Sequence, residues 1–119
     1  MNFDDAIQKH AEWRMKFRTA MSMKQKVDAS AIGKDNCCEL GKWLYAEGKT
    51  LHGRLASYNQ CIEAHKGFHV EAGRVAVLIN DGKCSEAEKH LAAGSAYSRA
   101  STSIAGALMK LKSESAKAA

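Results

Sequence analysis

The sequence has no proline, no long apolar segment and no targeting segment at its start. The absence of proline removes the residue that most strongly breaks helices. The longest strongly apolar run covers residues 75–79, which is far too short to cross a bilayer. The first ten residues are acidic and then amphipathic, unlike the apolar core of a signal peptide. We therefore expect a soluble, cytoplasmic protein that does not associate with membranes.

β-Branched residues are also sparse, and they show no strand-like alternation with polar residues. Alanine, lysine, glutamate, methionine and leucine are plentiful, and these residues lose little conformational freedom in a helix. A chain of 119 residues is the usual size of one domain. The sequence therefore predicts a single all-α domain over residues 1–119.

Apolar residues recur at intervals of three and four in four segments, which are separated by joints that contain glycine. The pattern predicts helices over residues 3–25, 36–47, 54–81 and 85–112. Three long helices and one short helix with brief connections are typical of an antiparallel four-helix bundle. Periodicity alone does not give the order in which these helices pair.

The charged residues and the cysteines exclude further classes of protein. The net charge of +5 is spread over the chain, without the concentrated basic face that nucleic-acid binding requires. The four cysteines would suit a disulfide framework only in a secreted protein, so we expect free thiols. Among them, Cys61 and Cys84 are predicted to be small, partly buried residues without a function of their own.

His65 and His69 are the most informative pair in the sequence. Residues four apart lie one above the other on a helix, so both imidazoles can reach one metal ion. Both histidines fall on the apolar face of the predicted third helix, where an unpartnered polar ring is unfavourable. An isolated pair of this spacing is more often two ordinary polar residues. No glutamate follows the first histidine, so the zinc-protease signature is absent.

His10 changes this interpretation, because it lies on the apolar face of the first predicted helix. Three such histidines on two helices favour a tetrahedral zinc site, which requires a fourth nitrogen or sulfur ligand. Cys38 is the best fourth candidate, although Cys37 is nearly equal on spacing alone. His52 and His90 are expected to face solvent.

The sequence resembles the chemoreceptor zinc-binding domain family over nearly its whole length. The resemblance is carried by His10, by CELGKW at residues 38–43 and by HKGFH at residues 65–69. The family pattern is a histidine, then C-x-[LF]-G-x-W, then H-x-x-F-H; each part is weak alone, but together they are specific. The resemblance implies one zinc ion per chain, bound by His10, Cys38, His65 and His69, and it selects Cys38 over Cys37. It also implies a homodimer that acts with a chemoreceptor or diguanylate cyclase module, in cis or in trans.

The resemblance further implies a sensor of zinc or of oxidants such as hypochlorous acid. Zinc holds its cysteine ligand as a thiolate, and oxidation of that sulfur weakens the bond to the metal. We expect Cys38 to be this redox-reactive residue and the short second helix, bounded by Gly33 and Gly48, to be the part that moves.

Four protein ligands leave no open position on the metal, and no carboxylate is placed to act as a base, so we expect no enzymatic activity. Two alternatives remain. The chain could be a purely structural, zinc-stabilised dimerisation module. An oxygen carrier of the hemerythrin type would need more histidines and bridging carboxylates than this chain aligns.

Overall fold

The computed structural model describes residues 1–118, which contain eight α-helices and no β-strand. The helices are α1 (Phe3–Ala11), α2 (Trp13–Ser22), α3 (Ala29–Ile32), α4 (Glu39–Leu44), α5 (Glu47–His52), α6 (Ala56–Asn80), α7 (Cys84–Leu91) and α8 (Ala96–Ala118). The predicted all-α class is confirmed. The helices number more than the predicted four, so the description as three long helices and one short helix is not confirmed.

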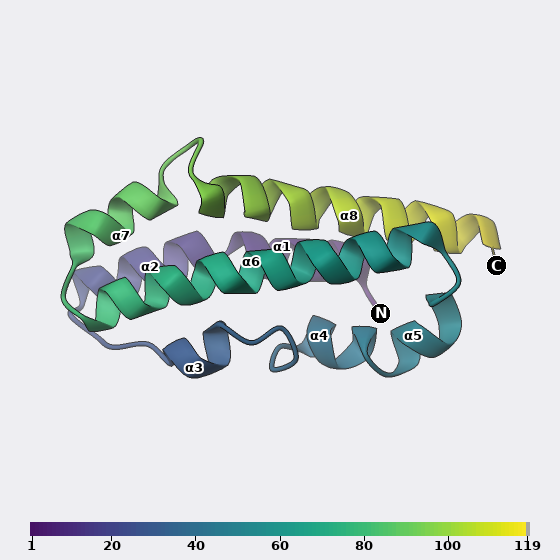
Figure 1. Ribbon diagram of the computed structural model, residues 1–119, viewed down its shortest axis with the longest axis horizontal. Coiled ribbons are helices and arrows are strands. Elements are labelled where there is room, and N and C mark those ends of the chain that lie inside the picture. The colour runs from purple at the N-terminus through teal and green to yellow at the C-terminus, as the bar shows by residue number, and fades with distance from the viewer. Residues whose placement is uncertain (119) are drawn as a thin grey trace.

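Helix α6 lies at the centre of an elongated molecule of 47 × 25 × 19 Å (Figure 1). It packs against α8 along one side, while α1 and α2 lie behind it in the view and α7 caps one end. The short helices α3, α4 and α5 follow one another along the opposite edge (Figure 1). Residues 1–55, which precede α6, therefore lie on two sides of it, and α8 completes the packing.

The predicted first and fourth helices are each divided in two. The first is divided at Glu12, between α1 and α2, and it ends at Ser22 rather than near residue 25. The predicted helix over residues 85–112 is interrupted between α7 and α8. Ala92 is extended there, and Gly94 has a φ of +80°, which glycine adopts far more readily than other residues. A single helix over residues 85–112 is therefore wrong.

The predicted second helix, over residues 36–47, is also wrong in its bounds. Helix α4 begins only at Glu39, because Cys38 is its N-cap with extended backbone angles. The backbone of Asp35 folds closely over α4, where a Cβ atom at position 41 would lie 1.8 Å from the Asp35 carbonyl oxygen. Only glycine permits this approach. Helix α5 covers residues 47–52, most of which lie between the predicted second and third helices.

The core is built mainly from the buried faces of α6 and α8, together with α2, α4 and α7. Its largest fully buried apolar side chains are Tyr97, Phe17, Phe68, Leu44, Leu91, Ile104, Leu108 and Leu111. Four polar residues are buried beside it, and three of them are histidines: His10, His65 and His69. Across residues 1–118, no helix is both long enough and apolar enough to cross a membrane.

Candidate metal centre

The structure brings four side chains from three parts of the chain to one point. His10 comes from α1, Cys38 precedes α4, and His65 and His69 lie one turn apart on α6. One nitrogen or sulfur atom from each of the four residues lies within 4.8 Å of the corresponding atoms of the other three. The sequence predicted these same four residues as ligands of one ion, and the fold places them together.

The distances among these atoms suit a small tetrahedral ion. The Cys38 Sγ atom lies 3.9 Å from His10 Nε2, 3.3 Å from His65 Nε2 and 3.6 Å from His69 Nε2. The two Nε2 atoms of His65 and His69 are 3.0 Å apart. Ordinary zinc bond lengths separate tetrahedral ligands by about 3.3 Å for two nitrogens and about 3.6 Å for nitrogen and sulfur. The observed distances differ from these values by a few tenths of an ångström.

Backbone carbonyl groups orient two of the imidazoles. His10 Nδ1 donates a hydrogen bond to the Ala6 carbonyl oxygen at 2.8 Å, and His69 Nδ1 donates one to the Ile32 carbonyl oxygen at 2.8 Å. Because a carbonyl oxygen only accepts, each Nδ1 atom carries the hydrogen, and each neutral ring directs the lone pair of Nε2 toward the centre. This is the usual arrangement of histidines that bind a metal.

Burial keeps the histidines neutral. His65 is fully buried, and its Nδ1 atom has no hydrogen-bond partner within the described chain. Burial, followed by the neighbouring His69 and His10, lowers the pKa of His65 to about 3. Burial also lowers the pKa values of His10 and His69. Three buried, neutral imidazoles therefore meet at one point.

Burial keeps the Cys38 thiol protonated, whereas it keeps the histidines from gaining a proton. Burial raises the pKa of Cys38, while the Gly41 amide N–H, which donates to Sγ at 3.3 Å, acts in the opposite direction. Without a cation the sulfur is therefore held as a thiol. A divalent cation among the four ligand atoms reverses this preference, because it favours the thiolate. The residues present thus fit a zinc ion in number, chemistry and spacing.

Phe68 forms the apolar wall of the cluster. Its fully buried ring lies 5.3 Å from the His10 ring and 5.4 Å from the His69 ring, measured between centroids. No role was predicted for Phe68 from the sequence, although its position between the two histidines was a usable signal. Trp43, from the CELGKW motif, packs against Phe3 and His52.

The remaining cysteines and histidines lie outside the cluster. Cys37 is exposed, with its Sγ atom 3.6 Å from Asn36 Oδ1. Cys61 is fully buried and Cys84 is exposed, so the prediction that both are partly buried is wrong. His52 and His90 are half-buried rather than exposed to solvent.

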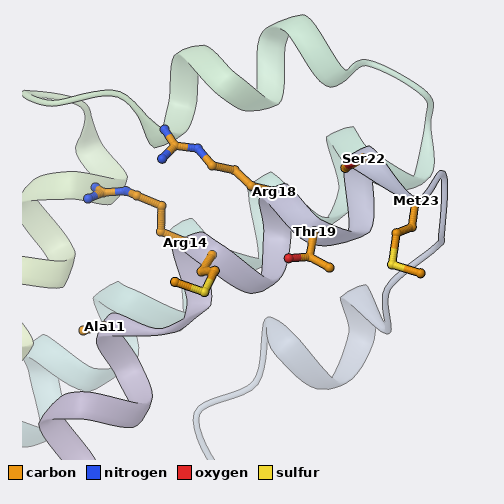
Figure 2. A pocket seen from close by; sticks show the side chains of 7 residues that line it. Ala11, Arg14, Arg18, Thr19, Ser22 and Met23 are labelled. Carbon is orange, nitrogen blue, oxygen red and sulfur yellow. The ribbon is translucent and has the colours of Figure 1, made fainter.

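A cavity of about 430 Å³ reaches the cluster from outside. It lies between α1 and the start of α4, and its lining includes Cys38, His10, Trp13 and the oppositely charged pair Lys9 and Glu39. A second cavity, of about 520 Å³, lies along α2 and is shown in Figure 2. Its lining includes none of the four cluster residues, so of these two cavities it is the first that borders the thiol.

Comparison with known proteins agrees with this geometry. A family model described as the chemoreceptor zinc-binding domain matches residues 10–76. The matched region begins at the first of the four cluster residues and extends past the last, and it covers more than half of the chain. No curated protein and no solved structure matches the chain.

Proposed function

This chain belongs to the chemoreceptor zinc-binding domain family, and we propose that it binds one zinc ion through His10, Cys38, His65 and His69. The observation that carries the proposal is the convergence of three imidazole nitrogens and one sulfur within 4.8 Å of one another. Structural zinc sites commonly use this kind of ligand set. The Nδ1 hydrogen bonds of His10 and His69 leave the Nε2 lone pairs of these two rings directed at the cluster, where a cation can accept them.

We further propose that the site is sensory and that Cys38 is its reactive residue. When bound, zinc supplies a positive charge that keeps the Cys38 sulfur as a nucleophilic thiolate. The sulfur is half-buried and borders the 430 Å³ cavity, so a small oxidant can reach it from solvent. The three histidines are inert toward mild oxidants, which makes Cys38 the ligand that can report one.

The proposed moving part is α4. Cys38 caps its first turn, so displacement of the sulfur from the three histidines also removes the hydrogen bond from the Gly41 N–H. The other end of α4 stays anchored, because the Tyr58 hydroxyl donates to the Leu44 carbonyl oxygen at 2.7 Å. Oxidation of Cys38, or removal of zinc by a chelator, would thus release the start of α4 while α6 remains in place.

The wider role that we propose rests on the family. We propose a cytoplasmic regulatory domain that forms a homodimer and acts with a chemoreceptor or diguanylate cyclase module, in cis or in trans. We propose no catalytic activity for it, because three imidazoles and a thiol complete a tetrahedral site and no carboxylate of the described residues belongs to the cluster.

A purely structural role is the second candidate, and one observation favours it. The ligand residues come from α1, the start of α4 and α6, so a bound ion would cross-link three elements of a small domain. In that case zinc would stabilise the fold or a dimer, and oxidation of Cys38 would have no specific consequence.

Metal analysis and zinc titration test the binding proposal. We expect one zinc per chain, and we expect Cys38→Ser to weaken zinc binding at least about 100-fold, since even outer partners of zinc ligands contribute 10- to 100-fold. Cys84→Ser is the matched control, because Cys84 is an exposed thiol outside the cluster. Equal zinc affinity of the two variants would contradict the proposed ligand set.

Oxidation separates the sensor from the structural module. With limiting peroxide or hypochlorous acid, a sensor predicts that Cys38 is oxidised before Cys61 and Cys84. It also predicts faster amide hydrogen exchange in α4 than in α6 after oxidation. A structural module predicts neither the preference nor the coupled change.

A further inference from the structure

A second thiol lies directly beside the proposed reactive cysteine. Cys37 precedes Cys38 in the chain, and both residues lie in a bend before α4 rather than inside a helix. Cys38 faces the three histidines, whereas Cys37 is exposed to solvent. The other two cysteines belong to different elements, since Cys61 is fully buried in α6 and Cys84 begins α7.

We propose that Cys37 is the resolving thiol of the site and forms a reversible disulfide with Cys38 after Cys38 has been oxidised. This inference rests on the proposed oxidation of Cys38 and adds the reaction that follows it. It assigns a function to a cysteine that the zinc cluster leaves unused.

The chemistry has two balanced steps, with hydrogen peroxide or a hypohalous acid as the oxidant. In the first, the Cys38 thiolate attacks an oxygen of the oxidant and becomes a sulfenic acid, and hydroxide or halide leaves with the electron pair. In the second, the Cys37 sulfur attacks the Cys38 sulfur, and the S–O bond breaks as the S–S bond forms. The departing hydroxide takes the proton of the Cys37 thiol and leaves as water.

Proximity and backbone freedom favour this second step. Adjacent Cα atoms are separated by about 3.8 Å across a trans peptide, so the two sulfurs cannot diffuse apart. On a helix, neighbouring side chains point in different directions, but residues 37 and 38 precede the first helical turn of α4. Cys38 can therefore turn its side chain outward at the cost of its N-cap interaction with Gly41.

Such a bond would be easy to reverse. Most disulfides join Cα atoms about 4.4–6.8 Å apart, so a bond between adjacent cysteines is strained and readily reduced. Two molecules of an external thiol would restore both cysteines by exchange. The bond would also protect Cys38 from further oxidation to sulfinic acid, which ordinary thiols do not reduce. While it persists, the sulfur is withdrawn from the three histidines.

Peptide mass spectrometry of the zinc-loaded full chain tests the proposal. Trypsin cuts after Lys34 and Lys42, so both sulfurs remain in the peptide 35–42, which contains no other cysteine. After treatment with limiting hydrogen peroxide, we expect this peptide to lose two hydrogen atoms and to resist alkylation. Glutathione should restore it fully.

Two variants of the chain complete the test. When Cys37→Ser is treated with an excess of hydrogen peroxide, we expect Cys38 to gain two oxygen atoms as a sulfinic acid, with recovery by glutathione reduced roughly tenfold or more. Cys84→Ser, which changes an exposed thiol elsewhere, should behave like the unmodified chain. Equal recovery in Cys37→Ser, or a disulfide that joins peptides from two chains, would overturn the assignment of Cys37.

The order in which the cysteines are oxidised distinguishes a failure of the Cys37 proposal from a failure of the proposed sensory function. If Cys38 is oxidised first but Cys37 stays free, the sensor proposal survives and the resolving thiol does not. If Cys38 is not oxidised in preference to Cys61 and Cys84, both proposals fail. Diamide joins two thiols without a sulfenic acid, and absence of the bond in the diamide-treated chain would overturn the inference on Cys37 alone.

Discussion

Of the three regions that supply the cluster, α6 and the start of α4 differ most in how firmly the fold holds them. Helix α6 is a continuous helix of 25 residues at the centre of the molecule, and its two histidines are at most 2% exposed. Cys38 stands before a helix of six residues at the edge, and its side chain is only half-buried. The nitrogen ligands are therefore part of the core, whereas the sulfur ligand depends on a short segment.

This difference is what the proposed switch requires, because one side of the site is held by the core and the other by a short segment. Two of the imidazoles are oriented by hydrogen bonds that they donate to carbonyl oxygens: His10 to Ala6 within α1, and His69 to Ile32 at the end of α3. The sulfur is positioned by local contacts, chiefly the close approach of Asp35 to Gly41 and the hydrogen bond from Tyr58 to Leu44. Changes to these local contacts should therefore displace the segment that carries Cys38 and leave α6 with its two histidines in place.

The largest loss of stability is expected from Gly41→Ala, which changes the packing of the short segment that carries Cys38. The added Cβ would lie 1.8 Å from the Asp35 carbonyl oxygen, so the backbone that carries Cys38 must move. We expect the zinc-loaded protein to lose about 3 kcal/mol of unfolding free energy, as overpacking costs of this kind indicate. Urea denaturation measures this loss, and zinc titration should show weaker binding.

Gly67→Ala is the matched control on the long helix. Gly67 lies between the two histidines of α6, and a Cβ there would meet no atom within 4 Å. Because alanine is the better helix former, we expect stability to rise by about 0.5–1 kcal/mol, with zinc affinity unchanged. A loss of zinc binding in this variant equal to that in Gly41→Ala would remove the distinction between the two regions.

The second prediction is that His65→Leu stabilises the metal-free protein but destabilises the zinc-bound protein. In metal-free protein its Nδ1 atom is buried without a partner, so His65→Leu should raise the unfolding free energy by about 1–2 kcal/mol. With saturating zinc the same variant should be less stable than the unmodified protein, because the stabilisation by bound ligand is lost. His52→Leu, outside the cluster, should leave the zinc-dependent stabilisation unchanged. Destabilisation by His65→Leu in both states would contradict this account.

The sequence predicted the firmly held region better than the loosely held one. The spacing of His65 and His69 gave their common face, because a long buried helix keeps its period. The start of α4 was predicted three residues early, since the close approach of the Asp35 backbone to Gly41 leaves no trace in the apolar periodicity.

Spacing in the sequence was also not enough to decide which cysteine joins the cluster. Spacing alone left Cys37 and Cys38 nearly equal, and only the family pattern favoured Cys38. In the structure the bend before α4 separates the two, with Cys38 in the cluster and Cys37 exposed. The break between α7 and α8 was missed for a related reason, because Gly94 sits in an alanine-rich segment with otherwise good helix propensity.

The third prediction concerns pH and the metal-free protein. In the unfolded chain His65 binds a proton below pH 6.5, whereas in the fold its pKa is lowered to about 3. Between these values the unfolded state binds more protons, so stability is present above pH 6.5 and falls as the pH is lowered. We expect a loss of about 1.4 kcal/mol per pH unit from this residue. Urea denaturation from pH 7 to 5 measures how the unfolding free energy changes with pH. The change should be smaller in His65→Leu, and an unfolding free energy that does not depend on pH would refute the prediction.

The smallest effect is expected from Tyr58→Phe, which loosens the anchored end of α4. The change removes the hydroxyl that donates to the Leu44 carbonyl oxygen at 2.7 Å and should cost about 1 kcal/mol. A cost of this size raises the open population of α4 about fivefold, so alkylation of Cys38 and amide exchange in α4 should accelerate by that factor. Tyr97→Phe changes another buried tyrosine, which packs on Phe17 and Phe68 instead of α4, and should leave both rates unchanged. Equal acceleration in the two variants would mean that α4 opens only when the whole domain unfolds, and the short segment could then not act as a separate moving part.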